Sequence, residues 1–533
     1  MTETKVFVIG IDAATFDLMG PWLEAGKLPH IRSVMDRGCS GVLESSMPPL
    51  SPVAWPSLYT GVNPGKHGIF DFVERAKSGS GISFLNRSHC KAQPLWRYLN
   101  KAGYRTGIVN VPMTFPPDPV DGFLVAGLDT PSVRSPFTYP PELKDDIIAA
   151  VGKYIIELEH SPRLMDDPIR YLEMMYEMIE VREKTVHYLM SRSPVDFFMV
   201  VFTATDRVQH TYWKYIDPQH PDHRPGLEDA ILRVYERVDA AVGRLLRRID
   251  PSASVLIVSD HGMNGIHKSA DLNSLLREKG FLHLKDDPFS RAYDFYRRVK
   301  RRLLKTNEIL WFDHFVDWKR TKAFHIGSWG NIYLNVKGRD PQGIVNPGNE
   351  YETVRESIAE ELLRLRDPAN GKQVIRAVKR KEEIFTGGLL AHAPDLVILW
   401  EDHYNCVKTV HENMRGRTRG LLQPCGVICA DHHPDGIVII SSPQMKQGVR
   451  GLRARITDIA PTVLSLMNVE VPPSMDGRVL AELFEAGAPG GSGEKRSAGT
   501  GEDAPGNGGG EAAYSGEDAE LIAERLRNLG YIE

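Results

Sequence analysis

Three strand-like apolar runs in this sequence are each followed closely by an aspartate. The runs and their carboxylates are 6–11 with Asp12, 197–202 with Asp206, and 254–259 with Asp260. In an open α/β sheet, side chains at the carboxyl ends of neighbouring strands converge on one crevice, even when they lie far apart in the sequence. His210 lies four residues after Asp206, and His261 directly follows Asp260. Carboxylates and imidazoles at such spacing are typical metal ligands, so the pattern predicts a two-metal hydrolase.

Both aspartate–histidine pairs also have a purely structural interpretation. Positions i and i+4 lie on one face of a helix, so Asp206 and His210 can reach a shared ion, but this spacing is also common by chance. The turn expected at Asp260-His261-Gly262 would direct two side chains at one ligand. The same three residues also suit an Asx-turn with a histidine facing solvent. The metal site is therefore inferred from their combination.

Ser51 precedes Pro52 at the start of an expected helix. A serine before a proline fits an N-cap with proline at the first helical position, where the missing amide hydrogen costs nothing. The same geometry suits catalysis, because free amides at a helix N-terminus bind phosphate oxygens and a metal beside the hydroxyl generates an alkoxide nucleophile. Taken alone, Ser51 is better explained as a cap.

The order of these polar residues along the chain is more informative than any one of them. Asp12 alone would suit a helix cap, and the Asp-His-His-Pro segment at 431–434 would suit a polar loop. Their joint order is Asp12, Ser51, Asp206 with His210, Asp260 with His261, and then His432. Such an ordered set is hard to obtain by accident.

The ordered set resembles the alkaline phosphatase superfamily, in the branch of type I phosphodiesterases and nucleotide pyrophosphatases. Residues 9–12, Ser51 with 60–69, 206–210, 258–263 and 432–437 carry the resemblance, which covers most of 5–482. It implies one metal held by Asp206, His210 and His432. It implies a second metal held by Asp12, Asp260 and His261. Ser51 would lie between the two as the nucleophile, where such enzymes use threonine or serine.

Simple chemistry supports this division of ligands. Two divalent ions about 3.5–4 Å apart hold the attacking and leaving oxygens of an in-line phosphoryl displacement, so no separate general base is required. A mixed aspartate and histidine set suits zinc and also manganese, whereas an oxygen-only set would favour magnesium or calcium. We therefore expect two divalent metal ions as cofactors, with zinc as the first choice, and a small-molecule phosphate ester as substrate.

Phe72 departs from the pattern of the resembled branch. Counting from the nucleophile, it occupies the position where nucleotide pyrophosphatases carry an asparagine that contacts the phosphoryl oxygens. The resemblance thus supports phosphate-ester hydrolysis better than it supports nucleotides as substrates. Two alternatives stay open: a phosphomonoesterase or phosphomutase-like phosphotransfer, and a non-catalytic metal-binding member of the superfamily. Sulfate esters rank low, because the segment after Ser51 lacks the Cys/Ser-x-Pro-x-Arg element of sulfatases.

Composition argues against several other classes of protein. A formal charge of −4 over 533 residues gives no whole-protein attraction to nucleic acid or anionic lipid. Five cysteines without tight pairing indicate neither a disulfide framework nor a zinc knuckle. No run approaches the roughly 18 apolar residues of a membrane span, and the N-terminus lacks signal-peptide features. We expect a cytoplasmic enzyme without a nucleic-acid partner, and nothing in the sequence indicates its oligomeric state.

Alternating strand-like and helix-like segments predict an α/β fold with a mainly parallel central sheet flanked by helices. The expected units are an alkaline phosphatase-like catalytic core at 1–285 and 426–485, an inserted cap at 286–425, a Gly-rich linker at 486–513 and a C-terminal amphipathic helix at 514–533. The linker composition buries too little apolar surface to order itself. The amphipathic pattern of this helix spans only 518–529, and an isolated helix of that length is marginal in water, so we expect it to dock on its own catalytic domain.

Three further segments have less specific interpretations. His67 lies in a Gly/Pro turn, where a histidine usually satisfies local backbone groups. The basic residues at 297–305 are more typical of a solvated helix face than of a lipid or anion site. Residues 123–125 are typical of a short strand, although the proline-rich stretch 112–141 around them resembles a long surface excursion.

Overall fold

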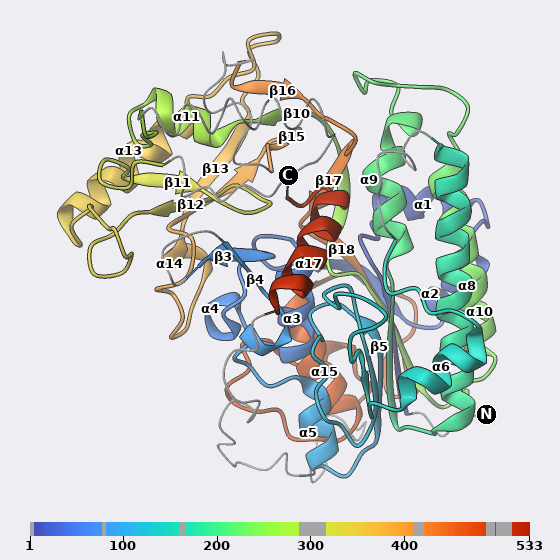
Figure 1. Ribbon diagram of the computed structural model, residues 1–533. Coiled ribbons are helices and arrows are strands. Elements are labelled where there is room, and N and C mark those ends of the chain that lie inside the picture. The colour runs from blue at the N-terminus through green and yellow to red at the C-terminus, as the bar shows by residue number, and fades with distance from the viewer. Residues whose placement is uncertain are drawn as a thin grey trace.

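The computed structural model describes residues 5–76, 82–158, 167–286, 316–408, 420–486, 496 and 514–532. Its central layer is a nine-stranded sheet with the order β19-β2-β18-β9-β1-β8-β5-β6-β7. Figure 1 shows helices on both sides of this sheet and a smaller lobe at one end of it.

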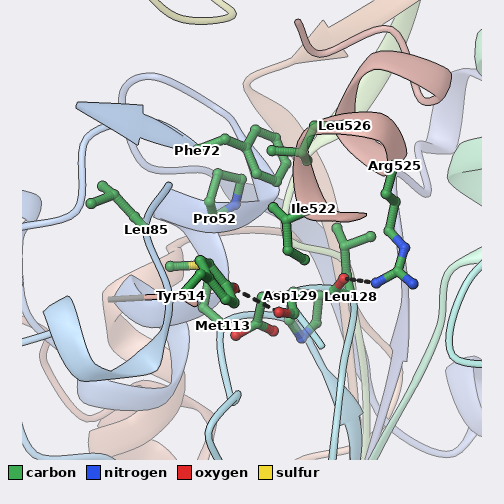
Figure 2. A pocket seen from close by; sticks show the side chains of 11 residues that line it. Pro52, Phe72, Leu85, Met113, Leu128, Asp129, Tyr514, Ile522, Arg525 and Leu526 are labelled. Atoms are coloured by element: carbon green, nitrogen blue, oxygen red, sulfur yellow. Dashed lines mark hydrogen bonds between the residues drawn. The ribbon is translucent and has the colours of Figure 1, made fainter. Parts of the chain in front are cut away.

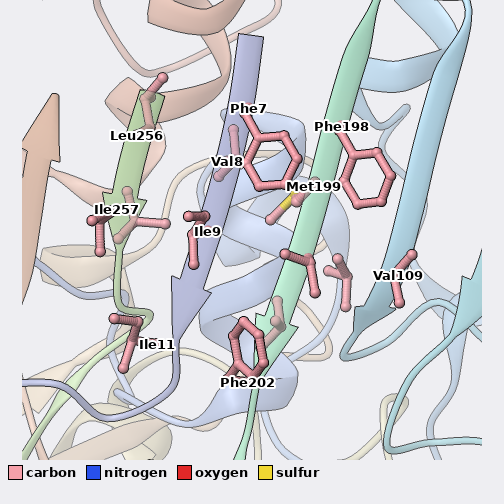
Figure 3. Packing of buried hydrophobic residues seen from close by; sticks show 14 of the residues in the cluster. Phe7, Val8, Ile9, Ile11, Val109, Phe198, Met199, Phe202, Leu256 and Ile257 are labelled. Carbon is pink, nitrogen blue, oxygen red and sulfur yellow. The ribbon is translucent and has the colours of Figure 1, made fainter. Parts of the chain in front are cut away.

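Four parallel strands form the middle of the sheet. In spatial order they are β9 (Ser254–Val258), β1 (Val6–Ile11), β8 (Phe197–Phe202) and β5 (Thr106–Val111). All of their residues are buried, since helices cover both faces and the strands are apolar on both. Phe7 stacks on Phe198 with ring centroids 5.0 Å apart, and Figure 3 shows the apolar side chains of these strands in contact. The predicted mainly parallel α/β fold is confirmed.

The outer strands of the sheet are of mixed direction. They are β18 (Asp435–Ser441), β2 (Cys39–Glu44) and β19 (Val449–Arg455) on one side, and β6 (Gly122–Ala126) and β7 (Thr138–Tyr139) on the other. β18 runs antiparallel to β9, so its first residue, Asp435, lies at the edge where β9 ends. A segment that enters β18 therefore reaches the same edge as the carboxyl ends of the parallel strands.

Two groups of helices cover the sheet (Figure 1). The first comprises α1 (Phe16–Glu24), α2 (Pro29–Asp36), α6 (Leu143–Val151), α8 (Pro168–Arg192), α9 (Ala204–Ile216) and α10 (Ala230–Leu246). The second comprises α3 (Ser51–Thr60), α5 (Leu95–Lys101) and α15 (Ile459–Leu466). α10 buries residues spaced three and four apart, the pattern of a helix with one face on a core.

The smaller lobe has its own sheet and its own hydrophobic cluster. Its strands and helices are β11 (Ala323–His325), β12 (Asn331–Leu334), β14 (Leu396–Trp400), β13 (Ile375–Arg380), α11 (Leu272–Glu278), α13 (Asn349–Leu363) and α14 (Lys381–Ile384). A third sheet joins β10 (Gly262–Ala270) to β15 (His403–Cys406), β16 (Leu422–Pro424) and β17 (Ala430–His433). The domain boundaries given above stay a prediction.

Three short elements and a last helix are also described. β3 (Val73–Arg75) pairs with β4 (Ile82–Phe84), and α4 (Pro64–His67) is a single turn. α17 (Gly516–Asn528) contributes Ile522, Ala523 and Leu526 to the cluster of the smaller lobe. In Figure 1 this helix, drawn in red, lies between the lobe and the central sheet.

Several expectations differ from the structure or lie outside it. The strand predicted at 123–125 is confirmed by β6, but residues 112–141 are more than a surface excursion, because β6 and β7 belong to the central sheet and Phe115 and Phe137 are buried. The basic segment 297–305 and nearly all of the Gly-rich linker lie outside the described residues. No helix in the described part of the chain is long and apolar enough to cross a membrane.

Candidate active site

Three adjacent parallel strands bring the three predicted aspartates together. Asp12 follows β1, Asp260 follows β9, and Asp206 lies in the first turn of α9 just after β8. β1 is hydrogen-bonded to both of its neighbours, so the three carboxyl ends are held in register. A hydrogen bond of 2.6 Å from Thr205 Oγ1 to the Asp12 carbonyl oxygen ties the start of α9 to the end of β1. All three carboxylates are buried.

Asp206, His210 and His432 form one compact group, here called the first triad. The Asp206 Oδ1 atom lies 3.3 Å from His210 Nε2 and 3.6 Å from His432 Nε2, and the two imidazole nitrogens are 3.1 Å apart. His210 Nδ1 is 2.7 Å from the Ala430 carbonyl oxygen. That contact requires a proton on Nδ1 and leaves the Nε2 lone pair available to a metal.

Asp12, Asp260 and His261 form the second triad. His261 Nε2 lies 3.1 Å from Asp260 Oδ2 and 3.8 Å from Asp12 Oδ1. His261 Nδ1 is 2.9 Å from the Gly262 carbonyl oxygen, which again leaves Nε2 free as an acceptor. The rings of His261 and His432 stack with centroids 3.9 Å apart, so the two triads adjoin each other.

Ser51 is buried beside the second triad, and its hydroxyl oxygen lies 3.1 Å from His261 Nε2. The cap interpretation of this serine is wrong. The residue at the N-cap of α3 is Leu50, while Ser51 is the first helical residue and directs its hydroxyl at a histidine. Its helix packs closely on β1, because a Cβ placed on Gly10 would lie 2.5 Å from the Trp55 ring. Glycine in β1 therefore permits the approach that positions Ser51.

The polar atoms of the two triads fit divalent cations. Asp12 Oδ1, Asp206 Oδ1 and Asp260 Oδ2 are buried and accept no hydrogen bond within the described ranges. Burial, together with Asp260 and Asp206, raises the pKa of Asp12 well above its usual value. Burial and the nearby His261 lower the pKa of His432 to about 3, so its imidazole is neutral. Buried carboxylates that cluster around imidazoles, each with an oxygen that accepts no hydrogen bond, are groups that bound cations would compensate.

Asp431 is close enough to His210 and His432 to be considered as a ligand, but its oxygens are already used. Oδ1 accepts from Lys408 Nζ at 3.0 Å and Oδ2 accepts from Asn405 Nδ2 at 2.7 Å. Lys408 opposes the effect of burial and holds the pKa of Asp431 well below its usual value. We therefore assign Asp431 to the support of His432 and not to the ligand set.

Two residues near the site were missed by the sequence analysis. Arg207 lies between two predicted ligands in the sequence, yet its long side chain is as compatible with a solvated position as with the buried one it occupies. Its Nη1 atom donates to Asp206 Oδ2 at 2.7 Å and to the Tyr531 hydroxyl at 2.9 Å. No local sequence pattern links Tyr531 to the site, because it lies 325 residues from Asp206 in the sequence.

A buried apolar ring lies near one side of the site, and a cleft reaches the other side. Phe72 is buried and lies with its ring centroid 4.4 Å from that of Tyr531. A cleft of about 460 Å³ reaches His432 from the smaller lobe and is lined by Trp329, Arg376 and Trp400 among others. This cleft is the candidate approach for a substrate.

Three histidines outside the two triads are bonded locally. His67 Nδ1 accepts from the Ile69 amide at 3.2 Å and its Nε2 is 3.0 Å from Ser57 Oγ, as a scaffolding residue would be. His267 Nε2 is paired with Asp217 Oδ2 at 2.8 Å, and His325 Nδ1 with the Asn331 carbonyl oxygen at 3.0 Å. All five cysteines are buried and unpaired with one another.

Comparisons with known proteins give a family match and solved structures with a similar fold. The family model described as type I phosphodiesterase / nucleotide pyrophosphatase matches residues 6–422. No curated protein gives a significant match. Among solved structures, the phosphonoacetate hydrolase of Sinorhizobium meliloti 1021 in complex with phosphonoformate aligns with a TM-score of 0.54 and 15% identity, covering 86% of this chain and 94% of that one.

A mammalian structure shares the same fold. Murine ectonucleotide pyrophosphatase / phosphodiesterase 5 aligns with a TM-score of 0.52 and 13% identity, covering 90% of this chain and 100% of that one. Because the family model spans well over half of the sequence, this chain belongs to the type I phosphodiesterase / nucleotide pyrophosphatase family.

Proposed function

We propose that this protein hydrolyses phosphate esters in two steps, through a phosphorylated Ser51 beside two divalent metal ions. The observation that supports the proposal is a buried hydroxyl in contact with the second triad, which itself adjoins the first triad. Asp206, His210 and His432 would hold one ion, and Asp12, Asp260 and His261 the other. Three nitrogen-and-oxygen ligands for each ion favour zinc first and manganese second.

When bound, such a pair of ions supplies charge for the attacking and leaving oxygens and lowers the pKa of the nucleophile. The residues of the chain position the reacting groups. Ser51 Oγ forms a bond to phosphorus while the bond to the departing alcohol oxygen breaks, and the serine proton ends on that oxygen. Water then attacks the phosphoserine, the bond from Ser51 Oγ to phosphorus breaks, and a proton from the water returns to Ser51.

Phe72 bears on the choice of substrate. An apolar ring at this position supplies no amide to a phosphoryl oxygen, and it packs on the ring of Tyr531. A phosphodiester carries a second organic group on phosphorus, and apolar walls such as Trp329 and Trp400 in the cleft at His432 suit this group better than a second charged oxygen. We propose phosphodiesters as the preferred class, with phosphomonoester hydrolysis, phosphomutase-like transfer and metal binding without catalysis as the alternatives to be tested.

The experiment compares Ser51→Ala with Ser51→Thr. We expect Ser51→Ala to lose turnover of bis-nitrophenyl phosphate while keeping its metal content, and Ser51→Thr to keep activity because it retains the hydroxyl. Acid quenching of the wild type during turnover should leave a phosphoryl group on the peptide that contains Ser51.

Each outcome decides between the candidates. Activity in Ser51→Ala equal to the wild type excludes the covalent route. Faster turnover of nitrophenyl phosphate than of the diester favours the phosphomonoesterase. Two bound metals without release from either compound, or from phosphonoacetate, would favour the non-catalytic alternative.

A further inference from the structure

The last residues of the chain are anchored onto the catalytic core. Arg525 donates to the carbonyl oxygens of Leu128 at 3.1 Å and Pro131 at 2.9 Å, and also to that of Thr130. The Tyr514 hydroxyl donates to the Asp129 carbonyl oxygen at 2.6 Å. Figure 2 shows the bonds of Arg525 to Leu128 and of Tyr514 to Asp129 beside a small cavity, lined by apolar side chains that include Phe72, Ile522 and Leu526. The segment is thus fixed at several points before the chain reaches Tyr531.

Tyr531 is fully buried against the first triad. Its hydroxyl accepts from Arg207 Nη1 at 2.9 Å and lies 3.4 Å from Asp206 Oδ2, to which it donates. Its ring centroid is 5.9 Å from that of His210 and 5.8 Å from that of His432. One side chain near the C-terminus therefore contacts all three members of the first triad.

These contacts give the two oxygens of Asp206 different surroundings. Oδ2 receives hydrogen bonds from Arg207 and Tyr531, whereas Oδ1 faces the two histidines without a donor in the described part of the chain. A carboxylate held through one oxygen presents the other in a fixed direction. Groups that orient a ligand in this way commonly change metal affinity or activity by 10–100-fold when they are removed.

The position of Tyr531 is itself secured by both halves of the molecule. Ser328 of the smaller lobe donates from Oγ to the Tyr531 carbonyl oxygen at 2.8 Å. Lys408, which is bonded to Asp431 beside His432, lies 5.4 Å from the centre of the Tyr531 ring. Glu157 balances the buried Arg207, with 3.4 Å between Glu157 Oε1 and Arg207 Nε.

We propose that Tyr531 is a positioning residue for the metal held by Asp206, His210 and His432, so that the C-terminal segment 514–532 completes the active site. This inference rests on the proposed function, because it concerns one of its two metals. Metal binding and docking of the segment then favour each other by the same factor, as thermodynamic linkage requires.

The test compares Tyr531→Phe with Tyr514→Phe in the full-length protein. Each variant loses one hydroxyl from the same segment and keeps its aromatic ring, but only the first hydroxyl contacts a ligand. Zinc dissociation constants are measured by chelator competition on the apoprotein. We expect Tyr531→Phe to weaken one of two ions by about 10–100-fold and leave the other unchanged, and Tyr514→Phe to change neither.

A second measurement does not depend on turnover. Hydrogen exchange of the amides in 516–532 is followed with and without zinc in the wild type and in both variants. Zinc should slow this exchange in the wild type and in Tyr514→Phe, and much less in Tyr531→Phe. We also expect Tyr531→Phe to have a lower kcat than the wild type, while its KM stays within a factor of about two of the wild-type value.

The results separate the two proposals. A wild type that binds fewer than two ions refutes the proposed function, and the role of Tyr531 with it. A wild type with two ions, but Tyr531→Phe indistinguishable from Tyr514→Phe in affinity and exchange, refutes only the role of Tyr531. Equal weakening of both ions in Tyr531→Phe assigns the residue to general stability and likewise refutes the inference.

Discussion

Three buried carboxylates within reach of one another define the chemistry of this site at the scale of single residues. Asp12, Asp206 and Asp260 each keep one oxygen without a hydrogen-bond donor from the described residues. Burial and mutual repulsion raise the pKa of Asp12, while the neighbouring histidine opposes burial and lowers the pKa of Asp260. Such a cluster is costly for a protein to bury unless positive charge is bound within it.

The Asp260→Asn variant tests this at a single ligand. We expect its metal content to fall from two ions per chain to one, because a neutral amide is a much weaker ligand. The loss of several kcal/mol of transition-state stabilisation corresponds to a fall in kcat of about 10³-fold. Metal analysis and turnover are measured on one sample. Asp435→Asn, at a nearby carboxylate in a surface ion pair, is the control and should retain both.

His67 provides a pH test of stability away from the metal ligands. Burial lowers the pKa of His67 to about 3, so the folded protein keeps it neutral. Below the unfolded pKa of about 6.5 the unfolded chain binds a proton that the folded chain does not, and stability falls by up to about 1.4 kcal/mol per pH unit toward pH 3.

The matching variant is His67→Gln, which keeps a donor and removes the titration. The unfolding free energy of the wild type minus that of the variant should decrease as the pH falls below about 6.5. Denaturant titration at several pH values measures both free energies. A difference that stays constant with pH would show that His67 does not titrate in this way.

At the scale of elements, the site depends on how closely α3 approaches β1. The apolar runs at 6–11, 197–202 and 254–259 made the central strands predictable from sequence, because strands buried on both faces are continuously apolar. The carboxylates at their ends could be placed for the same reason. The first residue of α3 could not be placed from the sequence, because Leu50 and not Ser51 occupies the N-cap position.

Gly10→Ala tests the contact between α3 and β1. The added methyl group would lie 2.5 Å from the Trp55 ring and 2.8 Å from Val201 Cγ2, so one of them must shift. We expect a loss of about 1–3 kcal/mol in unfolding free energy and a lower kcat, because α3 carries Ser51. Gly20→Ala in α1 is the control. Its new Cβ meets nothing within 4 Å, and the helix-propensity gain of about 0.5–1 kcal/mol is opposed by Pro21, which disfavours a Cβ on the preceding helical residue, so we expect little net change in unfolding free energy.

At the scale of the whole molecule, three parts of the chain meet at one site. As a member of its family the protein is a hydrolase acting on phosphoric ester bonds. The core supplies the two triads, the smaller lobe lines the cleft at His432, and the C-terminal segment contacts the first triad. The amphipathic pattern at 518–529 predicted a helix that docks on its own catalytic domain. It could not predict where, because docking depends on complementary surfaces that the pattern of one helix does not encode.

Removal of the metal ions should therefore lower the stability of the entire fold. A ligand that binds only the folded state stabilises it by about 2.7 kcal/mol at 100 times its dissociation constant. We expect chelation to lower Tm, and zinc to restore it in a concentration-dependent manner, as measured by calorimetry. An unchanged Tm after verified removal of both ions would contradict this coupling.

The location of the ions is the most direct test of the active site described here. Anomalous X-ray diffraction at the zinc edge, on crystals grown with zinc, should give two neighbouring peaks beside Ser51. One peak should lie among Asp206, His210 and His432, and the other among Asp12, Asp260 and His261. A single peak, or peaks away from these residues, would contradict the two-metal site.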